Sequence, residues 1–144
     1  MSRYISNKLR KQVYERAYHC CEYCLAYEGH SFIKFQIEHI ISIKHRGLTD
    51  ITNLALACFF CNNRKGTDLG TLTEYEELIR FYHPRKDSWS DHFEIDKHFI
   101  LPKTDIAQGT INILGINDED RLAERMAFYE AGFFPHPNAL RLIS

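Results

Sequence analysis

Residues 36–65 read QIEHIISIKHRGLTDITNLALACFFCNNRK, and this stretch determines how the rest of the chain is interpreted. It places a carboxylate beside an imidazole at Glu38 and His39, and it ends in a Cys-x-x-Cys pair at Cys58 and Cys61. A second Cys-x-x-Cys pair lies upstream at residues 21–24. One metal ion bound by both pairs would close the loop between them and bring its polar residues together.

The two pairs supply four thiolates, which is the ligand set of a structural zinc site: Cys21, Cys24, Cys58 and Cys61. The gap between the pairs is longer than is usual in zinc ribbons. Cys20 could compete with Cys21, but Cys21 has the two-residue spacing to Cys24. A site closed by four thiolates keeps no open position, so this zinc is expected to stabilise the fold without catalysing. The alternative is that these are ordinary buried thiols.

Composition limits the class of protein. A chain of 144 residues with 13% aromatic residues should fold as one modest domain with a single core. Because no apolar run reaches membrane-spanning length and no signal-peptide core is present, we expect a cytoplasmic protein without membrane contact. In that compartment paired cysteines bind metal more often than they form disulfides.

The net charge of −1 hides an uneven distribution. Residues 1–65 carry ten Lys and Arg against five Asp and Glu, whereas residues 66–144 carry eight against fourteen. A basic half that contains the polar cluster suits a polyanionic partner, although a chance imbalance on a solvated face would look the same. Lys8, Arg10, Lys11 and Arg16 lie on a predicted first helix and could meet phosphates.

Local patterns predict both helices and strands in the first half. Ser6 can cap a helix that runs to about residue 17. Residues 32–43 alternate apolar and polar side chains and predict a strand or hairpin that places His39 on the core face. A purely structural, buried histidine is therefore the alternative there. Asp50 or Thr52 can cap a short helix that runs into the second Cys pair, and Gly66 can end the module as a helix C-cap.

The second half is predicted to add further short elements. Residues 73–76 show a capping-box pattern, which predicts a helix that ends at Pro84. Residues 93–95 and 99–101 predict two strands around a short turn, and residues 110–114 a third strand. A last helix is expected from Asn117 or Asp118 to about residue 130, stopped by Gly132 and followed by an extended tail.

The residues around His39 suit phosphodiester hydrolysis. That reaction needs a base to activate water and a hard cation to stabilise charge on the phosphate. His39 is the residue type for the base, and Glu38 and Asn62 offer oxygen ligands for Mg²⁺ or Mn²⁺. Adjacent residues of a regular strand face opposite sides, so Glu38 and His39 share a site only at a bulge or a strand end.

The order of these motifs resembles the HNH endonuclease family, with its zinc-bound ββα-metal (His-Me finger) module. The motifs are Cys21-Glu22-Tyr23-Cys24, Glu38-His39-Ile40, Asn53-Leu54 and Cys58-x-x-Cys61-Asn62-x-x-Lys65. The resemblance covers about residues 10–66 and implies an α+β fold. It implies His39 as general base, Asn53 as the residue that holds the loop and orients the histidine, and Glu38 and Asn62 as ligands of a catalytic cation. Arg10, Lys11, Arg64 and Lys65 are expected to contact the substrate.

The chain departs from the family pattern at three places without losing a predicted catalytic residue. Glu38 stands where Asp is more common, Ser42 replaces a common Pro, and only Gly47 remains of paired glycines. Residues 1–66 are therefore expected to form an active module, and residues 67–144 an α/β extension packed on it. Residues 81–85, 89–93 and 109–110 resemble an extension of some bacterial HNH proteins. Its histidines and Arg85 could touch substrate or be structural.

Three functions remain open from the sequence. The first is a metal-dependent endonuclease that hydrolyses DNA, with double-stranded DNA as the expected partner. The second is a zinc-stabilised nucleic-acid-binding module without catalysis, which the pairing of Glu38 with His39 argues against, since binding alone needs no base. The third is a zinc-stapled protein-interaction domain, which the acidic second half favours. The oligomeric state is not indicated, although cutting both strands would favour a dimer or two successive nicks.

Overall fold

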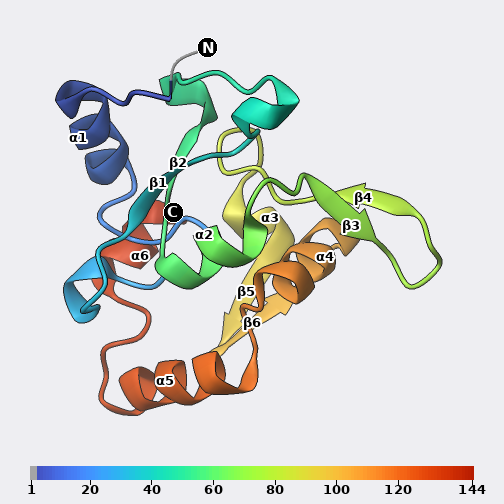
Figure 1. Cartoon of the computed structure of the whole chain (residues 1–144). Helices are drawn as coiled ribbons and strands as arrows, with labels where there is room; N and C mark the ends of the chain where they lie inside the picture. Colours follow the sequence, from blue (N-terminus) through green and yellow to red (C-terminus); the bar gives the residue numbers. More distant parts are fainter. Residues whose placement is uncertain (1–2) are drawn as a thin grey trace.

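The computed structural model describes residues 3–144 as an assembly of short helices and three two-stranded sheets. The longer elements, in chain order, are α1 (Asn7–Arg16), β1 (Gln36–His39), β2 (Leu54–Ala57), α2 (Phe59–Lys65), β3 (Gly70–Leu72), β4 (Leu78–Arg80), α3 (Trp89–His92), β5 (Phe93–Asp96), β6 (Phe99–Pro102), α4 (Asp105–Leu114), α5 (Glu119–Glu130) and α6 (Pro137–Leu142). Figure 1 shows α1, β1, β2 and α2 grouped on one side, with β3 to β6 and α4 on the other. Across residues 3–144, no helix is long and apolar enough to span a bilayer.

The first half forms a ββα unit behind helix α1. Ser6 caps α1 by accepting a hydrogen bond from the Leu9 N–H at 3.1 Å, as the sequence predicted. β1 and β2 pair antiparallel, with Gln36 opposite Ala57 and the last residues of the pair at His39 and Leu54. Helix α2 follows β2 directly and ends at Gly66, which is the predicted C-cap. The predicted α+β class with a ββα core is therefore confirmed.

Two predictions about this unit were wrong. The helix expected after Asp50 is only a single 3₁₀ turn, and residues 54–57 form strand β2. All four of these residues are buried, and a continuous apolar run suits a strand covered on both faces. The face of β1 is also reversed, because Glu38 is buried while Ile37 and His39 are only half-buried. A charged residue therefore occupies a core position, which the apolar alternation could not reveal.

The extension also differs from the prediction at residues 73–83. Instead of a helix, a hairpin of β3 and β4 forms, with Thr71 opposite Ile79. The Thr73 hydroxyl accepts hydrogen bonds from the N–H groups of Tyr75 and Glu77, at 3.3 and 3.2 Å. These bonds stabilise a tight turn in which Glu76 has a φ of +62°. The same threonine that resembled a helix cap therefore caps a turn.

Of the predictions for the later elements, some are confirmed and others are wrong. The paired strands around residues 96–99 are confirmed as β5 and β6, and the helix after Asp118 is confirmed as α5. The strand predicted at 110–114 is wrong, because these residues belong to α4, which Thr104 caps and Gly115 ends at φ +65°. The tail is not extended, since Pro137 takes the first position of α6, where its fixed φ suits a helix.

One hydrophobic core runs through both halves of the chain. It joins residues of the first half to residues of the extension, such as Val13, Tyr23 and Leu56 with Phe93, Ile100 and Leu114. The Trp89 indole N–H donates to the Tyr23 carbonyl at 3.0 Å, and Arg85 forms an ion pair with Glu22. Both contacts tie the extension to the loop that carries the first Cys pair.

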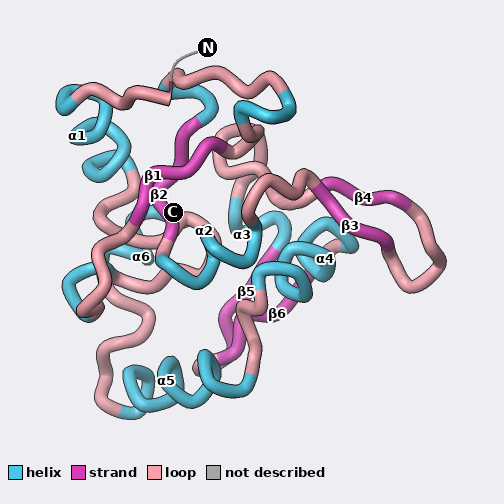
Figure 2. The backbone as a smooth tube through the Cα atoms, viewed as in Figure 1, coloured by secondary structure: helices cyan, strands magenta, loops and turns pink. Residues whose placement is uncertain are grey.

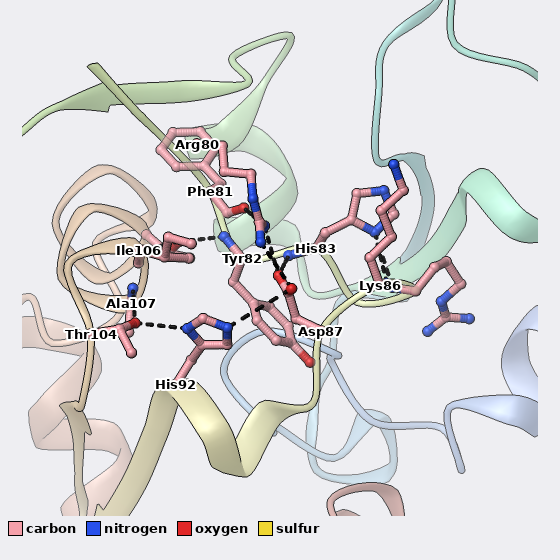
Figure 3. Close-up of polar contacts among 12 residues, drawn as sticks. Arg80, Phe81, Tyr82, His83, Lys86, Asp87, His92, Thr104, Ile106 and Ala107 are labelled. Carbon is pink, nitrogen blue, oxygen red and sulfur yellow. Dashed lines mark hydrogen bonds and ion pairs between the residues drawn. The ribbon is translucent and has the colours of Figure 1, made fainter. Parts of the chain in front are cut away.

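Two histidines of the extension, His83 and His92, contact Asp87, as Figure 3 shows. The Asp87 carboxylate accepts two hydrogen bonds from Arg80, at 2.7 and 3.0 Å, and one from the His83 N–H at 2.9 Å. The Nδ1 of His92 lies 2.7 Å from the Thr104 hydroxyl, and its Nε2 lies 3.9 Å from an Asp87 carboxylate oxygen. These contacts fix the β4–α3 connection to the start of α4.

Candidate metal centre and catalytic site

The four predicted cysteines meet in a buried cluster. The sulfurs of Cys21, Cys24, Cys58 and Cys61 all lie within 4.8 Å of one another. The Cys24 and Cys58 sulfurs are 3.7 Å apart, which matches the separation of about 3.8 Å expected for two sulfurs bound to one tetrahedral zinc. The cluster therefore fits zinc. Cys20 is buried but outside it, with its thiol 3.6 Å from the Tyr18 carbonyl, and burial raises its pKa to about 12.

The local backbone explains how each pair is shaped. In the first loop the Cys24 N–H points at the Cys21 sulfur at 3.5 Å, and Leu25 takes a left-handed φ of +67°. In the second pair the Cys61 N–H points at the Cys58 sulfur at 3.4 Å, because Cys58 caps helix α2. Backbone N–H groups directed at the sulfurs stabilise thiolates at both positions.

Asn53 closes the wide loop that connects β1 to β2 (Figure 2). Its side-chain oxygen accepts from the Ile41 N–H, and its amide N–H group donates to the carbonyls of Ile41 and Leu48, each at 2.9 Å. Gly47 allows this close packing, since a Cβ built there would lie 1.6 Å from the Ile41 carbonyl oxygen. Asn53 therefore fixes the backbone that immediately follows His39.

His39 lies at the end of β1 and is half-buried. Its Nε2 is 2.8 Å from the Thr49 hydroxyl in the loop that Asn53 closes. Partial burial lowers the pKa of His39 below its ordinary value, and the positive charges of Arg3 and Lys65 lower it further. The ring is therefore neutral near pH 7, which is the form that can accept a proton.

Glu38 faces the opposite side of the strand and is enclosed. The Tyr23 hydroxyl donates to its carboxylate, and the Lys65 ammonium lies 3.4 Å from Oε2. Oε2 accepts no hydrogen bond from the described residues, but a divalent cation there would meet the repulsion of Lys65. The strand end does not bring the Glu38 carboxylate and the His39 ring to one open site. In this arrangement Glu38 does not fit the role of cation ligand.

Part of the chain matches a known protein family. Residues 21–68 match the model of the HNH endonuclease family. This part of the chain is similar to HNH modules. The match includes both Cys pairs, His39, Asn53 and Asn62, and the resemblance noted in the sequence is confirmed. No curated protein and no solved structure matches the chain. The match to this family suggests a nuclease or another nucleic-acid-related function.

The other residues predicted from the HNH motif lie in different surroundings. Asn62 is half-buried on α2, and its side-chain amide donates to the Gln36 carboxamide oxygen on β1. Arg64 pairs with Asp118 at 2.6 Å and is half-exposed. Lys65, which was expected to contact substrate, has a side chain that is 2% exposed, and its Nζ donates to the Ile40 carbonyl at 2.8 Å.

Three of the four basic residues of α1 are exposed to solvent. Lys8, Arg10 and Lys11 all face solvent, and Lys11 has only a loose pair with Glu15 at 3.8 Å. Arg16 differs, since it donates to the carbonyls of Ile51 and Leu54, at 2.8 and 2.6 Å, and thereby fixes α1 to the start of β2. Part of the basic surface of residues 1–66 therefore lies on the first turns of α1, and Lys34, Lys44 and Arg46 are exposed as well.

Sequence patterns did not indicate Arg121, which contacts the cysteine cluster from the extension. Its Nη2 lies 3.3 Å from the Cys61 sulfur and 3.6 Å from the Cys58 sulfur. Although burial alone would lower the pKa of Arg121, the neighbouring thiolates raise it. An arginine on a polar helix, 60 residues away from the cysteine, carries no local pattern that would have marked it.

Proposed function

We propose that the chain is an HNH endonuclease that hydrolyses phosphodiester bonds in double-stranded DNA, with a structural zinc held by the four cysteines. The observation that carries this proposal is the state of His39. It is a neutral, half-buried imidazole at a strand end, next to a loop that Asn53 and Gly47 hold in place. Because burial lowers the pKa of any histidine, the support comes from the position of the neutral ring at the strand end, beside the loop that Asn53 and Gly47 hold.

In the proposed step, His39 acts as general base. With Nε2–H donating to the Thr49 hydroxyl, Nδ1 keeps its lone pair and accepts a proton from water. The resulting hydroxide attacks phosphorus, the bond from phosphorus to the leaving deoxyribose oxygen breaks, and a water molecule supplies the proton for that oxygen. Asn53 acts on this step indirectly, because it fixes the backbone that positions the ring.

Cleavage is proposed to require Mg²⁺ or Mn²⁺, because a hard cation stabilises charge on the phosphate and on the leaving oxygen. The predicted ligand pair of Glu38 and Asn62 is not formed, since Glu38 is paired with Lys65 and Asn62 with Gln36. A cation would need oxygen donors other than Glu38, such as the Asn62 amide and the substrate phosphate, or the release of Glu38 from Lys65.

A second candidate function has a specific observation in its favour. The buried pair of Glu38 with Lys65 is an arrangement that suits a nucleic-acid-binding module without catalysis, in which the family's acidic ligand has become part of the core. Under this alternative the chain binds DNA but does not cut it.

A single assay separates the two functions. Supercoiled plasmid is incubated with zinc-loaded protein and Mg²⁺ or Mn²⁺, and gel shifts are recorded on the same DNA in parallel. Nicked or linear product that depends on the added cation supports the endonuclease. Stable DNA binding without product, at every cation concentration, supports the binding module.

A further inference from the structure

A buried centre of zinc and four thiolates carries a net negative charge, and burying that charge is costly. Zinc and four thiolates together carry two net negative charges. The cysteines in question are all buried, and the cost of burying net charge is high unless opposite charges or hydrogen bonds compensate it. The backbone N–H groups at Cys21 and Cys58 are dipoles and leave this net charge in place, so a compensating positive charge would come from a side chain.

Arg121 on α5 has the position and the contacts for this role. Its Nη2 reaches the sulfurs of Cys61 and Cys58, and its Nη1 donates to the Leu114 carbonyl at 2.9 Å. The guanidinium also lies 5.4 Å from the centre of the Phe60 ring. Because contacts on three sides hold the group, little side-chain freedom remains to be lost when the sulfurs bind it.

Arg125 brings a second positive charge from the next turn of α5. Its side chain is buried, with Nε donating to the His98 carbonyl and Nη2 to the Asn117 side-chain oxygen, each at 2.6 Å. Arg125 and Arg121 both line the cavity of about 90 Å³ that also touches Cys24 and Cys58. The positive charges of Arg121 and Arg125 therefore equal in number the two net negative charges of a zinc centre with four thiolates.

We propose that helix α5 completes the zinc centre, with Arg121 as a positioning residue that holds the thiolates of Cys58 and Cys61 and retains the metal. Arg125 adds charge at longer range. This assigns a role to the extension, and it holds whether or not the chain cuts DNA. Groups that hydrogen-bond to metal ligands usually change metal affinity 10- to 100-fold when they are removed.

The test compares zinc release from full-length, zinc-loaded variants. Arg121→Met removes the guanidinium and keeps much of its bulk, while Arg141→Met makes the same change at an exposed position on α6. With a chromogenic chelator in excess, Arg121→Met should release zinc at least about tenfold faster than wild type, and Arg141→Met at the wild-type rate.

A spectroscopic readout separates this role from general stability. In cobalt-substituted protein, the thiolate-to-cobalt charge-transfer bands should shift in Arg121→Met and stay unchanged in Arg141→Met, because only the first loses N–H groups at the sulfurs. A folded Arg121→Met with wild-type spectrum and wild-type zinc release overturns the proposal. If that variant does not fold, Arg121→Gln decides. Faster zinc release from Arg121→Gln supports the role of charge, and a wild-type rate refutes it.

Discussion

Lys65 lies with its Nζ 3.4 Å from Oε2 of Glu38, and both side chains are almost completely buried. Together with the Tyr23 hydroxyl, which donates to the same carboxylate, this pair joins the first cysteine loop, β1 and α2. Removing one partner of a buried ion pair leaves an uncompensated charge, which costs far more than the pair contributes. The pair therefore links the acidic residue of the HNH motif to stability.

Glu38→Gln is expected to destabilise the zinc-loaded protein by about 3–5 kcal/mol, because it leaves the Lys65 ammonium buried without its counter-charge. Lys65→Met should cost a similar amount for the opposite reason. The double variant should lose less than the sum of the two, since neither charge is then stranded. Urea denaturation gives all three values. Wild-type stability of Glu38→Gln, combined with a higher Mg²⁺ requirement, would instead restore Glu38 as a cation ligand.

Asn53→Ala should destabilise the module on the order of 2–4 kcal/mol, because it leaves the buried backbone groups of the β1–β2 loop without partners. Hydrogen exchange should speed up at residues 41–53. Gly47→Ala should act on the same loop, since its Cβ would overlap the Ile41 carbonyl. Thr52→Ala is the matched control, because Thr52 is exposed and its hydroxyl donates to the exposed Asp50 carboxylate. Equal effects of Asn53→Ala and Thr52→Ala would contradict the role of Asn53.

The features that could be predicted from the sequence are those set by spacing along the chain. Two Cys-x-x-Cys pairs identify the cluster, because each pair is built by one local turn. The Ser6 cap and the Gly66 end of α2 follow in the same way from local backbone rules. Asn53 was found through the order of the HNH motif.

The features that could not be predicted depend on contacts distant in sequence. In the sequence Lys65 looks like a surface lysine, and only the fold places it beside Glu38. The role of Arg121 likewise depends on the fold, which brings it within 3.3 Å of the Cys61 sulfur. Thr73 shows a related difficulty, because one hydroxyl can cap a helix or a turn. The reversed face of β1 could not be predicted for the same reason, because Glu38 is buried in the core together with its partner Lys65.

Reversing Lys8, Arg10 and Lys11 to Glu is expected to weaken DNA binding without unfolding α1, because all three are exposed and α1 buries its other face through Val13 and Tyr14. If each wild-type residue contacts a phosphate, the plot of log affinity against log salt should lose about 0.9 in slope per residue. Fluorescence anisotropy at several salt concentrations measures this. An unchanged slope would place the footprint elsewhere, and reversal of Lys97 and Arg141 is the control.

The pH dependence of cleavage should report the lowered pKa of His39. The rate should fall as pH drops through that pKa, so the midpoint of the acid limb should lie below 6.5, the ordinary value for histidine. The same shift means that the folded state binds this proton less tightly than the unfolded chain. Stability from His39 is thus fully present above pH 6.5 and is lost as pH falls toward the folded-state pKa. A midpoint above 6.5 would contradict the assignment of the limb to His39.

His39→Ala tests the chemical step itself. If the ring only packs against the loop, the variant should lose stability and keep the wild-type rate per folded molecule. If it is the general base, the variant should stay folded, retain zinc and bind DNA, and lose about 10²–10⁴-fold in cleavage rate. His45→Ala is the matched control, because His45 is an exposed histidine of the same loop. Single-turnover rates on zinc-replete protein are required, since zinc loss would imitate loss of the base. A folded, zinc-loaded His39→Ala that cuts at the wild-type rate would remove His39 from the mechanism.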